Sequence, residues 1–275
     1  MNKQMEAYRT HLILEEKSEA TISKYLHDVF VFLTFLSDRE ISKKETIQFK
    51  SYLIEKGYSV RSVNSMIASL NKYLEFIGKN DYRVKNIKTQ RQLFCPEERE
   101  LTYNEYERLV TTAQRLKNER LSLLIQTICG TGIRVSELKF ITVESVMNGE
   151  AHVRCKSKDR KVFIVKKLRK RLIEFAKSHG IKSGSIFITK CGNPMNRSNI
   201  WREMKKLCQM ARVSPDKVFP HNLRHLFARV FYNIEKDIAK LADILGHSSI
   251  DTTRIYIVTT GFEHRKRMES MKLII

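Results

Sequence analysis

The chain contains no long apolar run. Its 275 residues include no stretch of about 18 consecutive apolar side chains, the length that a membrane-spanning helix requires. The first segment, Met1–Glu16, carries charges throughout and has no apolar segment of the kind found in a secretory signal. We therefore expect neither a membrane-spanning helix nor a signal peptide, and no membrane partner.

Cysteine is sparse and scattered. The five cysteines are far apart and none forms a C-x-x-C pair, which argues against a disulfide framework and against a zinc finger. A reducing cytoplasm is the simplest home for free thiols, so we expect a cytoplasmic protein. The cysteines are Cys95, Cys129, Cys155, Cys191 and Cys208.

Acidic residues are few relative to basic ones. The chain has 51 Lys+Arg against 30 Asp+Glu, a formal net charge of +21 and a pI of about 9.8. Such an excess indicates a polyanionic partner, most often nucleic acid, although basic membrane-surface proteins and ribosomal accessory factors share it. Residues 1–90 hold 15 basic and 11 acidic side chains, and residues 91–275 hold 36 and 19. We therefore expect the polyanion contact mainly in the second part.

Apolar periodicity predicts two domains. Helical spacing of apolar side chains over residues 1–90 indicates a bundle of four or five helices. The polar, irregular stretch at 91–100 contains Pro96 and is typical of a linker. Thr102 and Glu105 then form the sequence signature of a capping box, which predicts a helix from about residue 103 and a second domain over 101–275.

The second domain is predicted to be mainly helical with one small sheet. Two short strands, 151–155 and 162–165, flank a basic turn at 156–161, and 185–189 is a candidate third strand. The fold class is therefore mainly α with a small β-hairpin in the second domain. Further helices are expected at about 198–211, 221–234, 237–245 and 249–257.

Two patterns in this domain present basic side chains at turns. In G-T-G-I-R-V-S-E-L (130–138), two glycines supply a tight turn and Arg134 then opens a helix, a position suited to an anion. Lys156 begins the basic turn, where a lysine can give a proton to a leaving group or touch a phosphate. Taken alone, the arginine pattern is equally compatible with a helix-turn-helix corner that carries a surface arginine, and a lysine in a turn is usually just solvated.

A third pattern, P-H-N-L-R-H, covers residues 220–225. His221 and Arg224 share one face at the start of a helix and can grip the same anion. His221 and His225 also have the spacing of a zinc pair, but the metalloprotease motif requires Glu where this chain has Asn222. We therefore expect no metal and no other cofactor.

The fourth pattern, L-G-H-S-S-I-D-T-T-R-I-Y, covers residues 245–256. Gly246 ends one helix and Ser248 or Ser249 caps the next, so Tyr256 is expected about two turns along it. A single tyrosine is far more often a core or surface residue than a catalytic one.

Together the four patterns match the needs of phosphoryl transfer without a metal. Fixed arginines stabilise the extra negative charge on the oxygens of a pentacoordinate phosphorus. A phenol is a usable nucleophile and a tolerable leaving group, so a covalent step through tyrosine can run backward. Reversibility is what an enzyme that rejoins DNA requires.

At these residues the chain resembles the tyrosine recombinases of the phage integrase and Xer family. The segment at 130–138 resembles the one that carries the family's first catalytic arginine, and the basic turn resembles its β-hairpin lysine region. P-H-N-L-R-H-L-F-A and the segment ending at Tyr256 match two long motifs in the family's order. The helical first domain resembles the family's core-binding, DNA-binding domain in size and class only.

The resemblance implies a role for each of these residues. Tyr256 would attack the scissile phosphate, form a 3′-phosphotyrosyl bond and release a 5′-hydroxyl. Lys156 would be the general acid, assisted by His221, although Lys158 and Lys161 lie in the same turn. Glu137 and His225 would orient the others. The side chains expected around the phosphate are Arg134, Lys156, His221, Arg224 and His247.

The resemblance also implies partners and assembly. The expected enzyme is a two-domain, C-shaped clamp on double-stranded DNA, located with the nucleoid. Four protomers would assemble on paired sites and exchange strands through a Holliday junction, with accessory DNA-bending proteins as further partners. The apolar end, with Met268, Met271 and 273–275, either docks on a neighbouring protomer or packs on its own domain. The size fits a simple Xer-like enzyme without an arm-binding domain.

Three other functions use part of this equipment. A type IB topoisomerase uses the same chemistry to relax supercoils as a monomer. A catalytically silent regulator keeps only the basic clamp, although all six expected catalytic positions are filled here. A metal-dependent nuclease is the weakest alternative, because no acidic cluster accompanies the four patterns.

Overall fold

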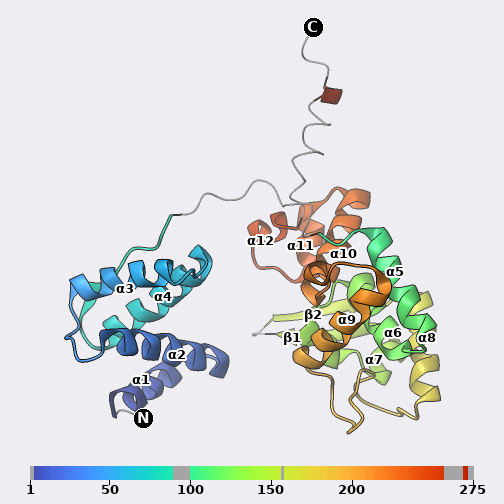
Figure 1. The fold of residues 1–275 in the computed structure, drawn as a ribbon. Coiled ribbons are helices and arrows are strands. Elements are labelled where there is room, and N and C mark those ends of the chain that lie inside the picture. Colours follow the sequence, from blue (N-terminus) through green and yellow to red (C-terminus); the bar gives the residue numbers. More distant parts are fainter. Residues whose placement is uncertain (1–2, 89–99, 156–157, 257–268, 272–275) are drawn as a thin grey trace. The chain divides into compact units, whose positions relative to one another are not determined.

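The computed structural model describes residues 3–88, 100–155, 158–256 and 269–271. The chain divides into two compact units, Met1–Arg91 and Gln92–Ile275 (Figure 1). The expected linker at 91–100 lies outside the described residues except for Glu100. None of the helices in the described ranges has the length and apolar character needed to cross a bilayer.

The first unit is a small helical bundle, as its apolar spacing predicts. Three helices begin at serine caps, because the hydroxyls of Ser18, Ser42 and Ser59 accept backbone N–H groups of the first turn. Buried aromatic and aliphatic side chains of α2, α3 and α4 form its main core. The elements are α1 (Lys3–Leu14), α2 (Glu19–Leu36), α3 (Lys43–Glu55), α4 (Val60–Phe76) and the short 3₁₀ helix η1 (Asn80–Tyr82).

The second unit is mainly helical and holds one two-stranded antiparallel sheet among its described residues. The Thr102–Glu105 capping box is present at the start of α5, as predicted. In chain order the elements are α5 (Tyr103–Arg115), α6 (Glu119–Thr131), η3 (Val135–Phe140), α7 (Val143–Asn148), β1 (Glu150–Cys155), β2 (Lys158–Phe163), α8 (Lys166–Ser178), α9 (Arg197–Ala211), η4 (Pro215–Lys217), α10 (Pro220–Glu235), α11 (Ile238–Leu245) and α12 (Ile250–Arg254).

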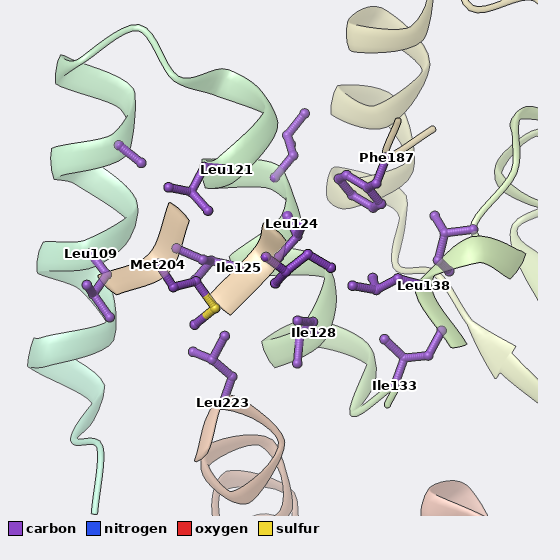
Figure 2. Close-up of a cluster of buried hydrophobic side chains, with 14 of the residues drawn as sticks. Leu109, Leu121, Leu124, Ile125, Ile128, Ile133, Leu138, Phe187, Met204 and Leu223 are labelled. Atoms are coloured by element: carbon purple, nitrogen blue, oxygen red, sulfur yellow. The ribbon is translucent and has the colours of Figure 1, made fainter. Parts of the chain in front are cut away.

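Helix α6 lies at the centre of the second unit. It packs against α5, α8 and α10, and eight of its side chains are buried. Figure 2 shows Leu109 of α5, Met204 of α9 and Leu223 of α10 directed toward the apolar side chains of α6. The last turn of α6 therefore holds the chain that follows, including Arg134, at a set position beside α10.

The hairpin has longer strands and a shorter connecting turn than predicted. Strand β2 begins at Lys158 and pairs from Cys155↔Lys158 to Glu150↔Phe163, so only Lys156 and Ser157 connect the strands. The predicted second strand is present, but it runs over Lys158–Phe163 and not over 162–165. Its first four residues are all charged, which hid a strand whose pairing is made by the backbone. The predicted third strand, 185–189, is also wrong: within the described ranges this segment makes only isolated bridges, Thr142↔Ser185 and Ile188↔Pro194.

Helix α12 is shorter than predicted. It ends at Arg254, and Tyr256 follows in a turn in which its N–H donates to the Thr253 carbonyl at 2.9 Å. Four β-branched residues, Ile250, Thr252, Thr253 and Ile255, lie in this segment, and β-branched side chains extend a helix poorly. Tyr256 thus lies just beyond the helix.

Gly132 alone makes the turn that was attributed to two glycines, since Gly130 is still inside α6. Gly132 caps the helix with φ +63°, in the left-handed region. A Cβ atom there would lie 2.5 Å from Cδ1 of Phe227 on α10. The backbone conformation and the close approach of α10 both require glycine at this corner.

We predict that Gly132→Ala lowers the free energy of unfolding of the second unit by about 2–4 kcal/mol, from backbone strain and overpacking together. Gly180→Ala is the matched control, because Gly180 has φ +65° but a Cβ atom added there would meet nothing within 4 Å. It should cost only about 1–2 kcal/mol. Urea unfolding followed by circular dichroism measures both, and equal losses would refute the close-packing argument.

Candidate active site

The structure brings seven of the eight predicted site residues into one region of the second unit. Arg134 comes from the corner after α6, His221, Arg224 and His225 from the first two turns of α10, and His247 from the α11–α12 connection. Tyr256 follows α12. Glu137, on η3, binds Arg134. Lys156 lies outside the described residues.

Arg224 is the centre of the cluster. Its side chain is fully buried, at 1 % exposure, and donates to the carbonyl oxygens of Gly132 at 2.6 Å and Leu245 at 2.7 Å. Burial lowers the pKa of Arg224 to about 10, with Arg134 adding repulsion and Tyr256 opposing the shift. The guanidinium therefore stays charged at neutral pH, and it ties the end of α6 to the end of α11.

His247 is held by Arg224 on one side and by the buried Thr253 on the other. Nη2 of Arg224 lies 2.9 Å from Nε2 of His247, and Nδ1 lies 2.8 Å from Oγ1 of Thr253. Because a guanidinium only donates, Nε2 must accept and the proton must sit on Nδ1. Burial, and then the charge of Arg224, lowers the pKa of His247 to about 4, so the ring is neutral at pH 7.

Glu137 is a buried carboxylate shared by two arginines. Oε2 accepts from the Arg134 backbone N–H at 2.9 Å, and Oε1 accepts from Nη1 of the same arginine at 2.9 Å. Arg160 donates to Oε2 at 2.6 Å. Burial raises the pKa of Glu137, but these hydrogen bonds and charges outweigh it and lower the pKa overall. The charged carboxylate thus orients Arg134, whose side chain remains 35 % exposed.

Arg160 is the residue that sequence reasoning missed. Its side chain on β2 is only 12 % exposed, and it enters the cluster beside Glu137. The missed signal was strand alternation: with β2 starting at Lys158, Arg160 falls on the same face as the buried Val162.

Three imidazole rings surround Tyr256. Its ring centroid lies 4.2 Å from that of His225, 5.3 Å from His247 and 5.6 Å from His221. Tyr256 is 5 % exposed and packs on Leu241 and Leu245. Burial, followed by the charges of His221 and Arg224, lowers the pKa of His225 to about 4, so His225 also is neutral at pH 7.

The cluster is built to receive an anion beside a phenol. Arg134, Arg160 and Arg224 carry three positive charges against the one carboxylate of Glu137. His221 is exposed in the first turn of the 16-residue α10, where backbone N–H groups and the helix dipole favour negative charge. Among the described residues, no group of three or more His, Cys, Asp or Glu side chains has a metal-binding arrangement.

We predict that stability falls between pH 7 and pH 5 because of His225. The unfolded ring takes up a proton near pH 6.5, whereas the folded ring stays neutral down to about pH 4. The depressed pKa thus gives stability that is complete above pH 6.5 and is lost as the pH falls toward 4. The expected loss from pH 7 to pH 5 is on the order of 1–2 kcal/mol.

Urea unfolding of wild type and His225→Gln at pH 7, 6 and 5 measures this loss. The variant should show a smaller slope of free energy against pH, because glutamine does not titrate. Identical slopes would mean that His225 is not held neutral in the fold.

Comparisons with known proteins find relatives in both sequence and fold. Tyrosine recombinase XerA of Pyrococcus horikoshii is 30 % identical over 279 residues, covering 98 % of this chain and 94 % of its own. The solved structure of a lambda integrase (75–356) dimer bound to a COC′ core site is 18 % identical, with a TM-score of 0.74, and covers 94 % of this chain and 95 % of that one. The Tn1549 transposon integrase in complex with transposon right end DNA also has a TM-score of 0.74, at 17 % identity, covering 97 % and 98 %.

Two family descriptions match, one in each unit. Residues 5–80 match the phage integrase N-terminal SAM-like domain, and residues 99–260 match the phage integrase family, a span that includes every residue of the cluster around Arg224. The chain therefore belongs to the phage integrase family of tyrosine recombinases.

Proposed function

We propose that this chain is a site-specific DNA recombinase that cuts and rejoins DNA through Tyr256. The observation that carries the proposal is the convergence at Arg224, which binds His247 directly and interacts with Tyr256. A phenol, a neutral histidine and a buried guanidinium are thereby held together in one cluster. That set fits the attack of tyrosine on a phosphodiester.

The proposed first step exchanges one phosphate ester for another. The Tyr256 oxygen forms a bond to phosphorus and gives its proton to the neighbouring His221, while the bond from phosphorus to the 5′ oxygen breaks. Arg134, Arg224 and His247 bind the non-bridging oxygens, whose charge increases in the transition state. For this the phosphate replaces Nε2 as the acceptor of Arg224, and His247 changes to the tautomer that donates from Nε2. Lys156 gives a proton to the departing 5′ oxygen, with His221 assisting, so that a 5′-hydroxyl leaves.

The second step reverses the first with a different strand. A 5′-hydroxyl from the partner duplex attacks the 3′-phosphotyrosine and gives its proton to the deprotonated Lys156. The bond from phosphorus to the Tyr256 oxygen breaks, and this oxygen takes back its proton from His221. No energy source is required, because each step keeps one phosphodiester bond. Glu137 and His225 orient the other groups: Glu137 holds Arg134, and the neutral His225 ring packs against Tyr256.

Partners and assembly follow from the same proposal. The structural neighbours include a lambda integrase dimer on a core site and a transposon integrase with DNA. We propose that both units of this chain contact double-stranded DNA, in the nucleoid. Strand exchange through a Holliday junction requires four active sites, so four protomers are proposed to assemble on paired sites. Integration, excision or resolution of a DNA element are the outcomes that this chemistry serves.

We predict that wild type forms a covalent adduct with DNA and that Tyr256→Phe does not, because phenylalanine has no nucleophilic oxygen. The substrate is a duplex target that the protein itself selects from a random pool, nicked so that the cut fragment diffuses away. Reactions contain EDTA, and denaturing gels show labelled DNA retained by protein.

Tyr232→Phe is the matched control, since Tyr232 is a half-buried tyrosine on α10 that packs on the same apolar cluster. It should form the adduct as wild type does. An adduct that persists in Tyr256→Phe would refute the choice of nucleophile. Relaxation of a supercoiled plasmid that lacks the selected target would favour a topoisomerase over a recombinase.

We predict that Lys156→Ala slows cleavage by about 10²–10⁴-fold, the contribution expected of a general acid. A target with a sulfur atom at the scissile 5′ position should restore the rate, because a thiolate leaves without protonation. Lys158→Ala is the control and should lose little on either substrate. If Lys158→Ala shows the loss and the rescue instead, the acid is Lys158.

A further inference from the structure

Arg160 is the one arginine of the cluster to which the proposed chemistry gives no role. It is the third residue of β2 and pairs with Val153, whereas its strand neighbours Asp159 and Lys161 are exposed. Placing a guanidinium at 12 % exposure is costly unless its charge and donors are matched. The partners that match the charge and donors of Arg160 therefore indicate its structural role.

Its donors bind two segments that are far apart in sequence. Nη2 donates to Oε2 of Glu137 at 2.6 Å, and Nη1 donates to the Ile244 carbonyl at 2.5 Å. The aliphatic part of the side chain lies against Gly246, where a Cβ atom would come within 2.5 Å of Cδ of Arg160. One side chain thus joins β2 to η3 and to the end of α11.

The two segments that Arg160 holds are the ones that present catalytic candidates. Glu137 binds the backbone and side chain of Arg134, and Nη2 of Arg134 reaches the Gly246 carbonyl at 3.4 Å. His247 is the next residue after that glycine. Arg160, Glu137, Arg134 and the 244–247 turn therefore form a closed ring of contacts.

We propose that Arg160 is a positioning residue, which holds Glu137 and the 244–247 turn in place so that Arg134 and His247 face the same phosphate. The inference rests on the proposed function. Because Arg160 belongs to β2, its contacts also attach the hairpin to the cluster. Lys156, the proposed general acid, precedes β2 by two residues in the sequence. Nη1 and Nη2 of Arg160 bind the Ile244 carbonyl and the charged Glu137 carboxylate, so in this proposal Arg160 acts through these neighbours and not on the phosphate.

The test compares Arg160→Met and Arg160→Lys with Arg154→Met. Arg154 is the matched control: it is an arginine in the same hairpin, its side chain is 81 % exposed, and its removal changes the charge equally. Adduct formation is measured in single turnover at saturating protein, and DNA affinity is measured separately, both well below the unfolding temperature of each variant.

Arg160→Met should cleave about 10–100-fold more slowly than Arg154→Met at similar DNA affinity, the loss typical of a supporting residue around a site. Arg160→Lys should fall between, because an ammonium can reach Glu137 but not the Ile244 carbonyl as well. Arg160→Met combined with Glu137→Gln should be little slower than the slower single variant. A fully multiplicative loss, or equal rates for Arg160→Met and Arg154→Met, would overturn the proposal.

A second readout needs no catalysis. Proteins carrying ¹³C-labelled histidine give ring signals, and the His247 signal is the one lost in His247→Gln. Arg160→Met should shift it and Arg154→Met should not. If wild type forms no adduct, the proposed function fails, while this measurement still decides the positioning role. An unmoved His247 signal in Arg160→Met would refute that role.

Discussion

The buried guanidinium of Arg224 is the interaction on which the rest of the site depends. Its two terminal nitrogens bind the backbone carbonyls of Gly132 and Leu245, which end two helices far apart in sequence, and one of them also reaches His247. A charge at 1 % exposure is tolerated only with such partners, so the helix ends must meet at this point for the unit to fold. Folding and the assembly of the site are thus the same event.

The electrostatic balance explains why the cluster suits a diester. Three arginines lie near a single carboxylate, and two neutral histidines add hydrogen-bonding capacity without adding charge. Repulsion among the arginines is partly relieved by backbone carbonyls, which supply partial charges only. A diester anion that binds to the cluster offsets part of its excess positive charge. The greater negative charge of a transition state offsets more of it. Burial, and then the same surplus of positive charge, lowers the pKa values of His225 and His247.

The sequence predicted the fold class and the residues that meet, but not the details of how they are held. Arg134, Arg224 and Tyr256 could be located because each stands in a long motif whose glycine and capping residues are close to it in the sequence. The bounds of the second hairpin strand were predicted wrongly, since charged residues hide a strand that is paired through its backbone. Arg160 was missed together with that strand. Alternation along β2 places it on the face of the buried Val162, but its contacts with residues 137 and 244–246 join segments that no local pattern brings together. The catalytic roles stay predictions.

The contact between Gly246 and Arg160 couples the side chains that these two distant positions can accept. Gly246 has φ +65°, and even a methyl group there would collide with the arginine side chain. A larger residue at 246 requires a shorter side chain at 160 as well as tolerance of the left-handed backbone. A shorter residue at 160 by itself leaves a gap and removes one of the partners of Glu137. Single-site libraries would therefore find each position intolerant, whereas paired libraries would open sequences that stepwise mutation does not reach.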